Sequence, residues 1–256
     1  MARYDHSPQA DQMITLRAIP SDLHLRAAST AILVVDMQND FGAEGGMFHR
    51  AGIDISMIQR AVRPTANVLS AARSVGLPIV YLKMAFRADL SDAGPPDSPN
   101  FLRHQTLGVG ASIVAPDGSA SRILIRDTWN TDILKELAPE SDDVVLYKHR
   151  FSGFFETELD DLLRQREIRS LIVVGATTSI CVESTIRDAM FRDYLCVLLS
   201  DCTGEPIGND FSRTNHEASL LSIQVLLGSV ASSTAFVNAV GVGGMSAPEI
   251  TSSESG

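Results

Sequence analysis

The sequence predicts an α/β fold in which a doubly wound parallel sheet carries helices on both faces, a three-layer arrangement with Rossmann-like topology. Two observations support this prediction. Continuous apolar runs, as in AILVV at 31–35 and LIVVG at 171–175, are typical of strands that are covered on both faces. Segments with helical periodicity separate these runs, and such alternation requires crossover connections, which favour a parallel sheet.

The elements follow one another in a regular order. Apolar runs rich in β-branched residues predict strands at 31–35, 77–83, 143–147, 171–175 and 195–201. Apolar residues at helical spacing predict helices at 57–76, 157–168, 181–194 and 212–227, followed by an apolar segment at 230–240. Gly76 can end the first helix, Pro64 is expected to split or kink it, and Thr157 is expected to cap the second.

The domain boundaries are expected where these patterns stop. Residues 1–28 are polar and aperiodic, and are interpreted as an N-terminal arm that lies on the body or on a neighbouring subunit. Residues 29–240 form the α/β domain, and the Gly- and Ser-rich residues 241–256 are expected to be disordered. Residues 84–130 show little periodicity, and a loop of that length is usually functional or disordered.

Composition and charge argue against several classes of protein. The net charge of −10 disfavours a nucleic acid or an anionic membrane as partner. The three cysteines lack disulfide or zinc spacing, which favours a reducing compartment. No apolar segment matches a signal sequence or a membrane span, so a cytoplasmic location is expected. The dinucleotide and P-loop fingerprints are both absent.

Three reactive side chains stand at the ends of three expected strands. Asp36 directly follows the first strand, Lys148 follows the third, and Cys181 opens the helix after the fourth. Each residue has an ordinary structural interpretation, since cysteines are often buried in cores, aspartates cap turns and helices, and lysines at strand ends are usually solvated. Because the carboxyl ends of parallel strands meet at one edge, however, the three are expected to converge at a ligand site.

The chemistry of the three groups is complementary. Backbone N–H groups at a helix start are expected to lower the pKa of the Cys181 thiol and to bind an oxyanion beside it. Apolar neighbours would desolvate the Asp36 carboxyl and suit it to general acid/base catalysis. Lys148 would keep the thiolate and the carboxylate ionised and help to bind an anionic intermediate.

Three motifs carry a resemblance to a known family. The segments VVDMQNDF, YKHRFSGFFETELDDLL and VVGATTSICVESTIRDA resemble those of the isochorismatase-like cysteine hydrolases, over roughly residues 28–232. The resemblance implies a six-stranded parallel sheet and a catalytic triad of Cys181, Asp36 and Lys148. It also implies a cis peptide at Ala176–Thr177, with the backbone N–H groups of Thr177 and Cys181 forming an oxyanion hole.

Within that superfamily the sequence is most similar to the ureidoacrylate amidohydrolases, with biuret hydrolases and N-carbamoylsarcosine amidases next. The resemblance implies a cysteine amidohydrolase that cleaves a C–N bond of a small ureide or amide through a thioester. Met84, Phe86 and Gln224 depart from the pattern of the ureidoacrylate enzymes. A Met and a Phe after the second strand predict a substrate that is less polar than ureidoacrylate.

The substrate-binding candidates are aromatic, apolar and basic residues near the strand ends, and ordinary core packing is an equally good interpretation for each aromatic one. They are Phe41, Met84, Phe86, Arg87, Trp129, Phe155 and Gln224, with Arg103 as an alternative to Arg87 for binding a substrate carboxylate. No metal and no other cofactor are expected, because YLKMAFRADL lacks the histidines of the related nicotinamidases, and His49, His104 and His149 show no ligand spacing. The family resemblance implies a homodimer or a homotetramer.

Other functions are compatible with the same fold. An isochorismatase-type vinyl ether hydrolase is one alternative, and a non-catalytic binding protein is another. A papain-like pair of Cys181 with His216 would require reach from a later helix, and a redox role for Cys181 lacks a resolving cysteine at obvious spacing.

Overall fold

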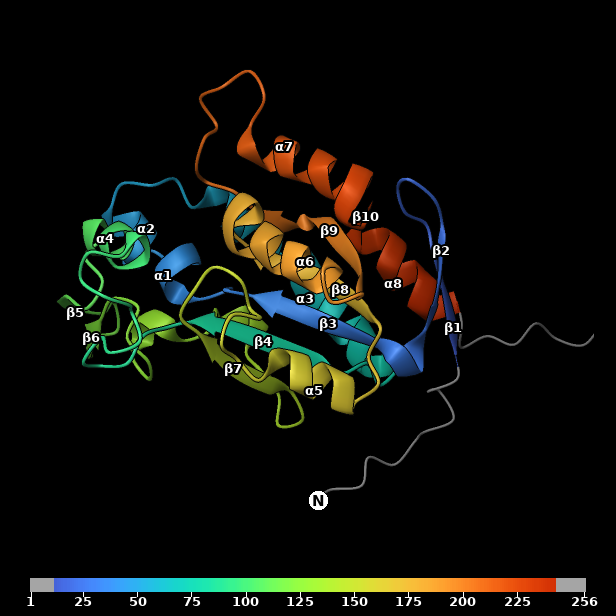
Figure 1. Ribbon diagram of the computed structural model, residues 1–256, viewed down its shortest axis with the longest axis horizontal. Coiled ribbons are helices and arrows are strands. Elements are labelled where there is room, and N and C mark those ends of the chain that lie inside the picture. The colour runs from blue at the N-terminus through green and yellow to red at the C-terminus, as the bar shows by residue number, and fades with distance from the viewer. Residues whose placement is uncertain (1–11, 243–256) are drawn as a thin grey trace, which may run out of the picture.

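The computed structural model describes residues 12–242 and contains a central six-stranded parallel sheet (Figure 1). The strand order is β10-β9-β8-β3-β4-β7. The strands are β3 (Thr30–Val35), β4 (Ile79–Met84), β7 (Val144–Lys148), β8 (Ser170–Ala176), β9 (Leu195–Gly204) and β10 (Ser229–Ala231). The α/β fold class and the parallel sheet predicted from the sequence are therefore confirmed.

Strand β3 lies inside the sheet, and its sequence explains why. Ile32 and Val34 belong to the apolar cluster on one face, whereas Leu33 and Val35 belong to the cluster on the other, and all four are buried. Because successive side chains of a strand point to opposite faces, a strand covered on both sides needs an unbroken apolar run.

Helices cover the two faces of the sheet (Figure 1). Helices α3 (Ser56–Ser74) and α8 (Ser233–Val242) pack on one face. Helices α5 (Leu159–Gln165), α6 (Glu183–Met190) and α7 (Asn215–Ser222) lie on the other. Pro64 lies inside α3 without splitting it, and Gly76 adopts a φ of 72° just beyond its end. Glu158, not Thr157, directly precedes α5, although the Thr157 hydroxyl accepts a hydrogen bond from the Leu159 N–H.

The smaller elements gather at the carboxyl edge of the sheet, toward which the arrowheads of β3 and β4 point in Figure 1. They are α1 (Asn39–Gly42), α2 (Met47–Arg50), α4 (Pro99–Thr106), and the hairpin of β5 (Ser112–Val114) and β6 (Ala120–Arg122). Single 3₁₀ turns lie at Ala27–Ser29, Trp129–Thr131 and Lys135–Leu137. The stretch 84–130 thus contains a helix and a hairpin that the weak periodicity of its sequence did not reveal.

Part of the expected N-terminal arm belongs to the body of the protein. Strands β1 (Met13–Leu16) and β2 (Leu23–Arg26) form an antiparallel hairpin that contacts α8. The Ile14 side chain is fully buried, and Ile19 pairs with Val230 along the edge of β10. Alternation over four residues is too short to have been recognised as a strand. Residues 1–11 of the arm, and most of the tail predicted at 241–256, lie outside the described residues.

No helix within residues 12–242 is long and apolar enough to cross a membrane.

We expect the substitution Ile14→Ala to reduce the free energy of unfolding by about 2–5 kcal/mol, because it leaves a cavity between the hairpin and the core. Met13→Ala is the matched control: Met13 is 49% exposed, against 0% for Ile14, and its loss should cost less than about 0.5 kcal/mol. Denaturant unfolding of both variants measures the difference. Equal, small losses would show that the hairpin does not pack on the body in solution.

Candidate active site

Asp36 follows β3 directly, and its carboxylate is held from two sides. The Met84 N–H donates to Oδ1 at 2.9 Å, and the Lys148 ammonium lies 2.7 Å from Oδ2. The second contact has the distance of a strong ion pair, but its angle falls outside hydrogen-bond geometry. Asp36 is 1% exposed, so the carboxylate interacts with protein groups and not with bulk water.

Lys148 is the last residue of β7 and lies opposite Met84 in the register of β4. Its side chain is fully buried. Besides Asp36, the ammonium donates to the Arg150 carbonyl at 3.2 Å and contacts the Met84 sulfur at 3.7 Å. A buried ammonium needs such partners, because an unpaired charge in the interior costs several kcal/mol.

Cys181 reaches the same point from the other half of the sheet. It lies in the π-helical turn η5 (Thr178–Val182), which directly precedes α6, so it is not in the first turn of an α-helix as expected. Its thiol lies close enough to the Asp36 carboxyl and the Lys148 ammonium for both charges to act on its pKa. The peptide Ala176–Thr177 is cis, and Gly175 is required just before it, since a Cβ there would lie 2.0 Å from the Val35 carbonyl oxygen.

The three groups shift one another's pKa values. Burial raises the pKa of the Cys181 thiol, and the opposing effect of Lys148 does not offset it. The expectation of a lowered thiol pKa is therefore wrong, because desolvation outweighs the field of the surrounding groups. Burial likewise raises the pKa of Asp36 despite the neighbouring ammonium. For Lys148, burial would lower the pKa, but Asp36 and Cys181 together raise it.

These shifts disfavour a second negative charge in the cluster. The pKa of Lys148 is raised, so its ammonium keeps its proton, and the raised pKa values of Asp36 and Cys181 favour retention of a proton at these two buried groups. Moving that proton from sulfur to carboxyl leaves the net charge of the cluster unchanged, so the two sites titrate as a pair. The arrangement can therefore form a thiolate without creating an additional charge in the protein interior.

Glu205 fixes the turn that carries the cysteine. It is fully buried, and its Oε2 accepts hydrogen bonds from the Ser179 N–H at 2.8 Å and hydroxyl at 2.6 Å. Its Oε1 accepts from the Ile207 N–H at 3.1 Å. Glu205 was not predicted as a site residue, because the apolar pattern placed the end of the fifth strand at 201, whereas β9 runs to Gly204. With the correct boundary, Glu205 is another carboxylate directly after a buried strand.

His216, on α7, also contacts this turn. Its Nδ1 lies 3.0 Å from the Thr178 hydroxyl, which in turn lies 2.9 Å from the Thr203 hydroxyl. Burial lowers the pKa of His216, so the ring is neutral near pH 7. The contact supports the turn from behind and does not reach the sulfur of Cys181 within the described residues.

A cavity of about 430 Å³ opens above the sulfur. Phe41 and Met84, both candidates from the sequence, line it, and so do Thr177 and Cys181, whose backbone amides are the expected oxyanion hole. The remaining lining residues are Met47, Phe48, Arg103, His104, Thr106, Leu107, Leu124, Phe151, Ile180 and Ile207. The walls therefore come mainly from α2, α4 and loops that the sequence could not place.

Five of the substrate-binding candidates do not line this cavity. Phe86 is fully buried behind the wall, with its ring 5.1 Å from that of His104. Arg87 is exposed, and Phe155 is 43% exposed beneath the Arg150 guanidinium. Gln224 lies in the π-helical turn η6 (Ile223–Leu227), just before the start of β10 and so at the opposite edge of the sheet.

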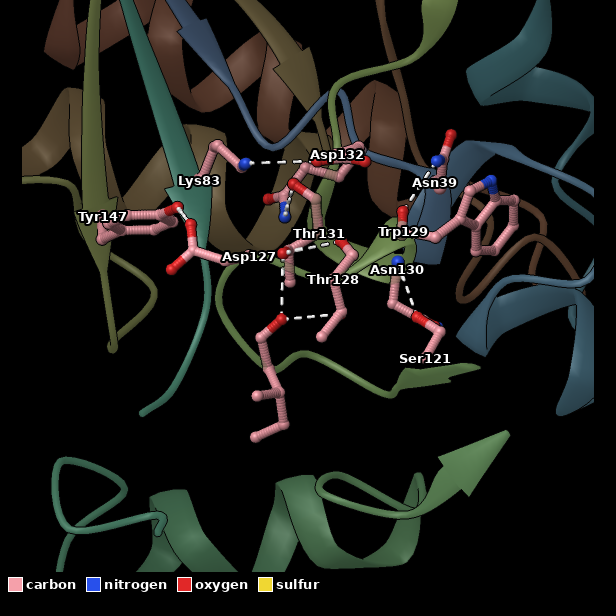
Figure 2. Close-up of polar contacts among 12 residues, drawn as sticks. Asn39, Lys83, Ser121, Asp127, Thr128, Trp129, Asn130, Thr131, Asp132 and Tyr147 are labelled. Carbon is pink, nitrogen blue, oxygen red and sulfur yellow. Dashed lines mark hydrogen bonds and ion pairs between the residues drawn. The ribbon is translucent and has the colours of Figure 1, made fainter. Parts of the chain in front are cut away.

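Trp129, the fifth, belongs to a segment that polar contacts hold against the sheet (Figure 2). Its backbone oxygen accepts a hydrogen bond from the Asn39 side chain at 2.7 Å. In the same segment, Asp127 accepts a hydrogen bond from the Tyr147 hydroxyl, and Asp132 lies 3.9 Å from the Lys83 ammonium. Trp129 therefore takes part in anchoring the segment and does not line the cavity.

Asp40 holds the cavity wall together. Its carboxylate accepts hydrogen bonds from the Met47 N–H at 2.9 Å and the Leu124 N–H at 2.7 Å, and a further one from the Asn130 side chain. Met47 and Leu124 both line the cavity. Burial raises the pKa of Asp40 to about 6. The run DMQND thus supplies two buried carboxylates, of which only Asp36 was predicted as a site residue.

Within the described part of the chain, no group of three or more His, Cys, Asp or Glu residues is arranged to hold a metal ion.

Comparisons with known proteins show the family to which the chain belongs. The model of the isochorismatase domain matches residues 30–235. The chain is 36% identical over 230 residues to ureidoacrylate amidohydrolase RutB of Rhizobium rhizogenes. The matched region covers 90% of this chain and 91% of the relative. It is 37% identical over 228 residues to the protein of the same name from an Enterobacter species, with coverages of 89% and 96%.

Two solved structures are similar in fold. A cysteine hydrolase from Pseudomonas syringae pv. phaseolicola gives a TM-score of 0.72 at 27% identity and covers 93% of this chain and 100% of its own. N-carbamoylsarcosine amidase from Thermoplasma acidophilum gives a TM-score of 0.59 at 26% identity, with coverages of 80% and 96%.

We expect Glu205→Ala to reduce the free energy of unfolding by about 1–3 kcal/mol, because the buried Ser179 N–H loses its acceptor. Catalysis should fall through kcat more than through KM, since the turn bearing Cys181 loses its anchor. Glu136→Ala, at an exposed position, is the control and should change neither quantity. Unfolding and steady-state kinetics measure both effects, and unchanged kcat in a folded Glu205→Ala protein would contradict the positioning role.

Proposed function

Because the chain belongs to the isochorismatase domain family, we propose that it is a cysteine-dependent amidohydrolase that cleaves a small ureide or amide through a thioester. It is a hydrolase of the C–N bonds of amides or ureides, as its curated relatives are named. The observation that carries the finer proposal is the contact of the Cys181 thiol with the Asp36 carboxyl and the Lys148 ammonium beneath the cavity.

The first half of the proposed cycle makes the thioester. Asp36 takes the proton of the Cys181 thiol, and the sulfur attacks the substrate carbonyl, forming a C–S bond and a tetrahedral oxyanion. The backbone N–H groups of Thr177 and Cys181 donate to that oxyanion. The C–N bond then breaks, and Asp36 returns its proton to the leaving nitrogen, which departs as ammonia or an amine.

The second half releases the acid. Water loses a proton to Asp36 and attacks the thioester carbonyl, the C–S bond breaks, and the proton returns to the sulfur. Lys148 keeps its positive charge throughout the cycle. This charge compensates the negative charge, which resides in turn on the carboxylate, the thiolate or the oxyanion. Location in the cytoplasm and assembly as a homodimer or a homotetramer remain predictions from the sequence.

Removal of the nucleophile tests the mechanism. We expect Cys181→Ala and Cys181→Ser to lower ammonia release by at least about a thousandfold while the fold is retained, because no other group can form the thioester. Cys196→Ala, inside β9, is the matched control and should keep its activity. An ammonia assay with ureidoacrylate, biuret, N-carbamoyl amino acids and simple amides measures the loss. Full activity in Cys181→Ala, or turnover of isochorismate in place of every amide, would refute the proposal.

The pH dependence tests the role of Asp36. Only the ionised carboxylate can take the thiol proton, and burial raises the pKa of Asp36, so kcat/KM should fall with decreasing pH through a value above that of an ordinary aspartate. In Lys148→Met the carboxylate loses its counter-ion, and this acid limb should move to higher pH. The profile is measured with a substrate that does not titrate in the range. An acid limb at the same pH in both proteins would contradict the assignment of Asp36 as the base.

A further inference from the structure

The cavity above Cys181 is lined mostly by apolar side chains. Nine of its fourteen lining residues are Phe, Met, Leu or Ile, and they come from α1, α2, the end of β4, η5 and the neighbouring loops. Only Arg103, His104, Thr106, Thr177 and Cys181 are polar. Such side chains contribute to the free energy of ligand binding only when apolar surface of the ligand covers them.

The cavity is also larger than a short ureide requires. A volume of about 430 Å³ could hold about fourteen water molecules at about 30 Å³ each, whereas a four-carbon ureido acid has only about nine non-hydrogen atoms. A small polar substrate would leave several lining side chains in contact with water, and would gain little from them.

Arg103 supplies the one cation that lines this cavity within residues 12–242. It lies in the last turn of α4, is exposed, and makes no ion pair or side-chain hydrogen bond with any described residue. A guanidinium without a protein partner is suited to a carboxylate, which it can bind through two parallel hydrogen bonds. Lys148 is not available for this purpose, because Asp36 already neutralises it.

His104 adds an acceptor and no second charge. Its Nδ1 lies 2.7 Å from the Asn100 carbonyl oxygen, which can only accept, so the proton of the ring is on Nδ1 and the Nε2 lone pair is free. Burial lowers the pKa of His104, and the ring is neutral near pH 7. The polar groups of the cavity therefore match a ligand with N–H donors and one anionic end.

We propose that the substrate is a ureide or amide in which an extended alkyl or aryl group separates the reacting carbonyl from a carboxylate, and that Arg103 binds this carboxylate. The inference rests on the proposed function, because it places the reacting carbonyl at Cys181. The relatives named for ureidoacrylate act on a ureide that is also an acid, and the apolar walls of this cavity extend that class to longer spacers.

The test uses a series of ω-ureido acids whose spacer grows from two to five methylenes, with 4-(ureidomethyl)benzoate as the aryl member and ureidoacrylate as the reference. Ammonia release by the wild-type protein gives kcat/KM, and calorimetric titration of Cys181→Ala with the same compounds gives Kd without turnover. We expect both to improve by about fourfold for each added methylene until the cavity is full.

Arg103→Gln tests the anionic end. Affinity for the acids should fall by about ten- to 150-fold, on the scale of a hydrogen bond to a charged group, while affinity for pentylurea, which lacks the carboxylate, should not change. Arg87→Gln is the matched control, since Arg87 is exposed outside the cavity, and it should have no effect.

Phe151→Ala tests the apolar wall. It should reduce the gain per methylene, whereas Phe155→Ala should not: the two rings are 40% and 43% exposed, but only Phe151 lines the cavity.

The outcomes separate this inference from the proposed function. Binding that is tightest for ureidoacrylate, or that is equal for all spacers and unaffected by Arg103→Gln, would overturn the inference even if ammonia is released. Binding that follows the spacer and Arg103, without ammonia release from any compound by the wild-type protein, would support the ligand class and overturn the amidohydrolase mechanism.

Discussion

The buried ion pair between Asp36 and Lys148 is the interaction on which the other features of the site depend. Asp36 directly follows β3 and Lys148 ends β7. These strands lie on either side of β4, and Met84 at the end of β4 contacts both residues. Loss of either charge would leave the other uncompensated in the interior, which costs about 3–5 kcal/mol. The pair therefore requires the register of three strands, and it also supplies the counter-charge that a buried thiolate needs.

The cysteine reaches this pair because of the sheet topology. From β3 the chain continues outward through β4 and β7, and then returns to form β8, β9 and β10 on the other side. The connections thus reverse direction between β3 and β8, and a crevice forms beyond the carboxyl ends of strands at such a switch point. Asp36 and Cys181 follow these two strands. Glu205 and Asp40 then hold the cysteine turn and the cavity wall in place through buried hydrogen bonds.

Much of this could be predicted where the signal is local and periodic. The strand that ends before Asp36 and the strand predicted at 171–175 are unbroken apolar runs. Their carboxyl ends were therefore located within a residue or two, and the polar residues there were identified as a site. Glu205 was missed because the apolar run before it is broken: Ser200 and Asp201 interrupt the run before β9 ends. The hairpin at 13–26 and helix α4 were missed because their periodic patterns are short.

The sequence by itself determined which groups lie at the carboxyl edge of the sheet, because side-chain alternation and strand order follow from apolar patterning and chain connectivity. Three properties could not be read from the sequence. They are the raised pKa of Cys181, the choice between Arg103 and Arg87 as the basic residue of the cavity, and the positions of Phe86 and Phe155 outside the cavity. These properties depend on desolvation and on which distant side chains meet. Both are set by how loops and helices pack in three dimensions, and no periodicity along the chain records them.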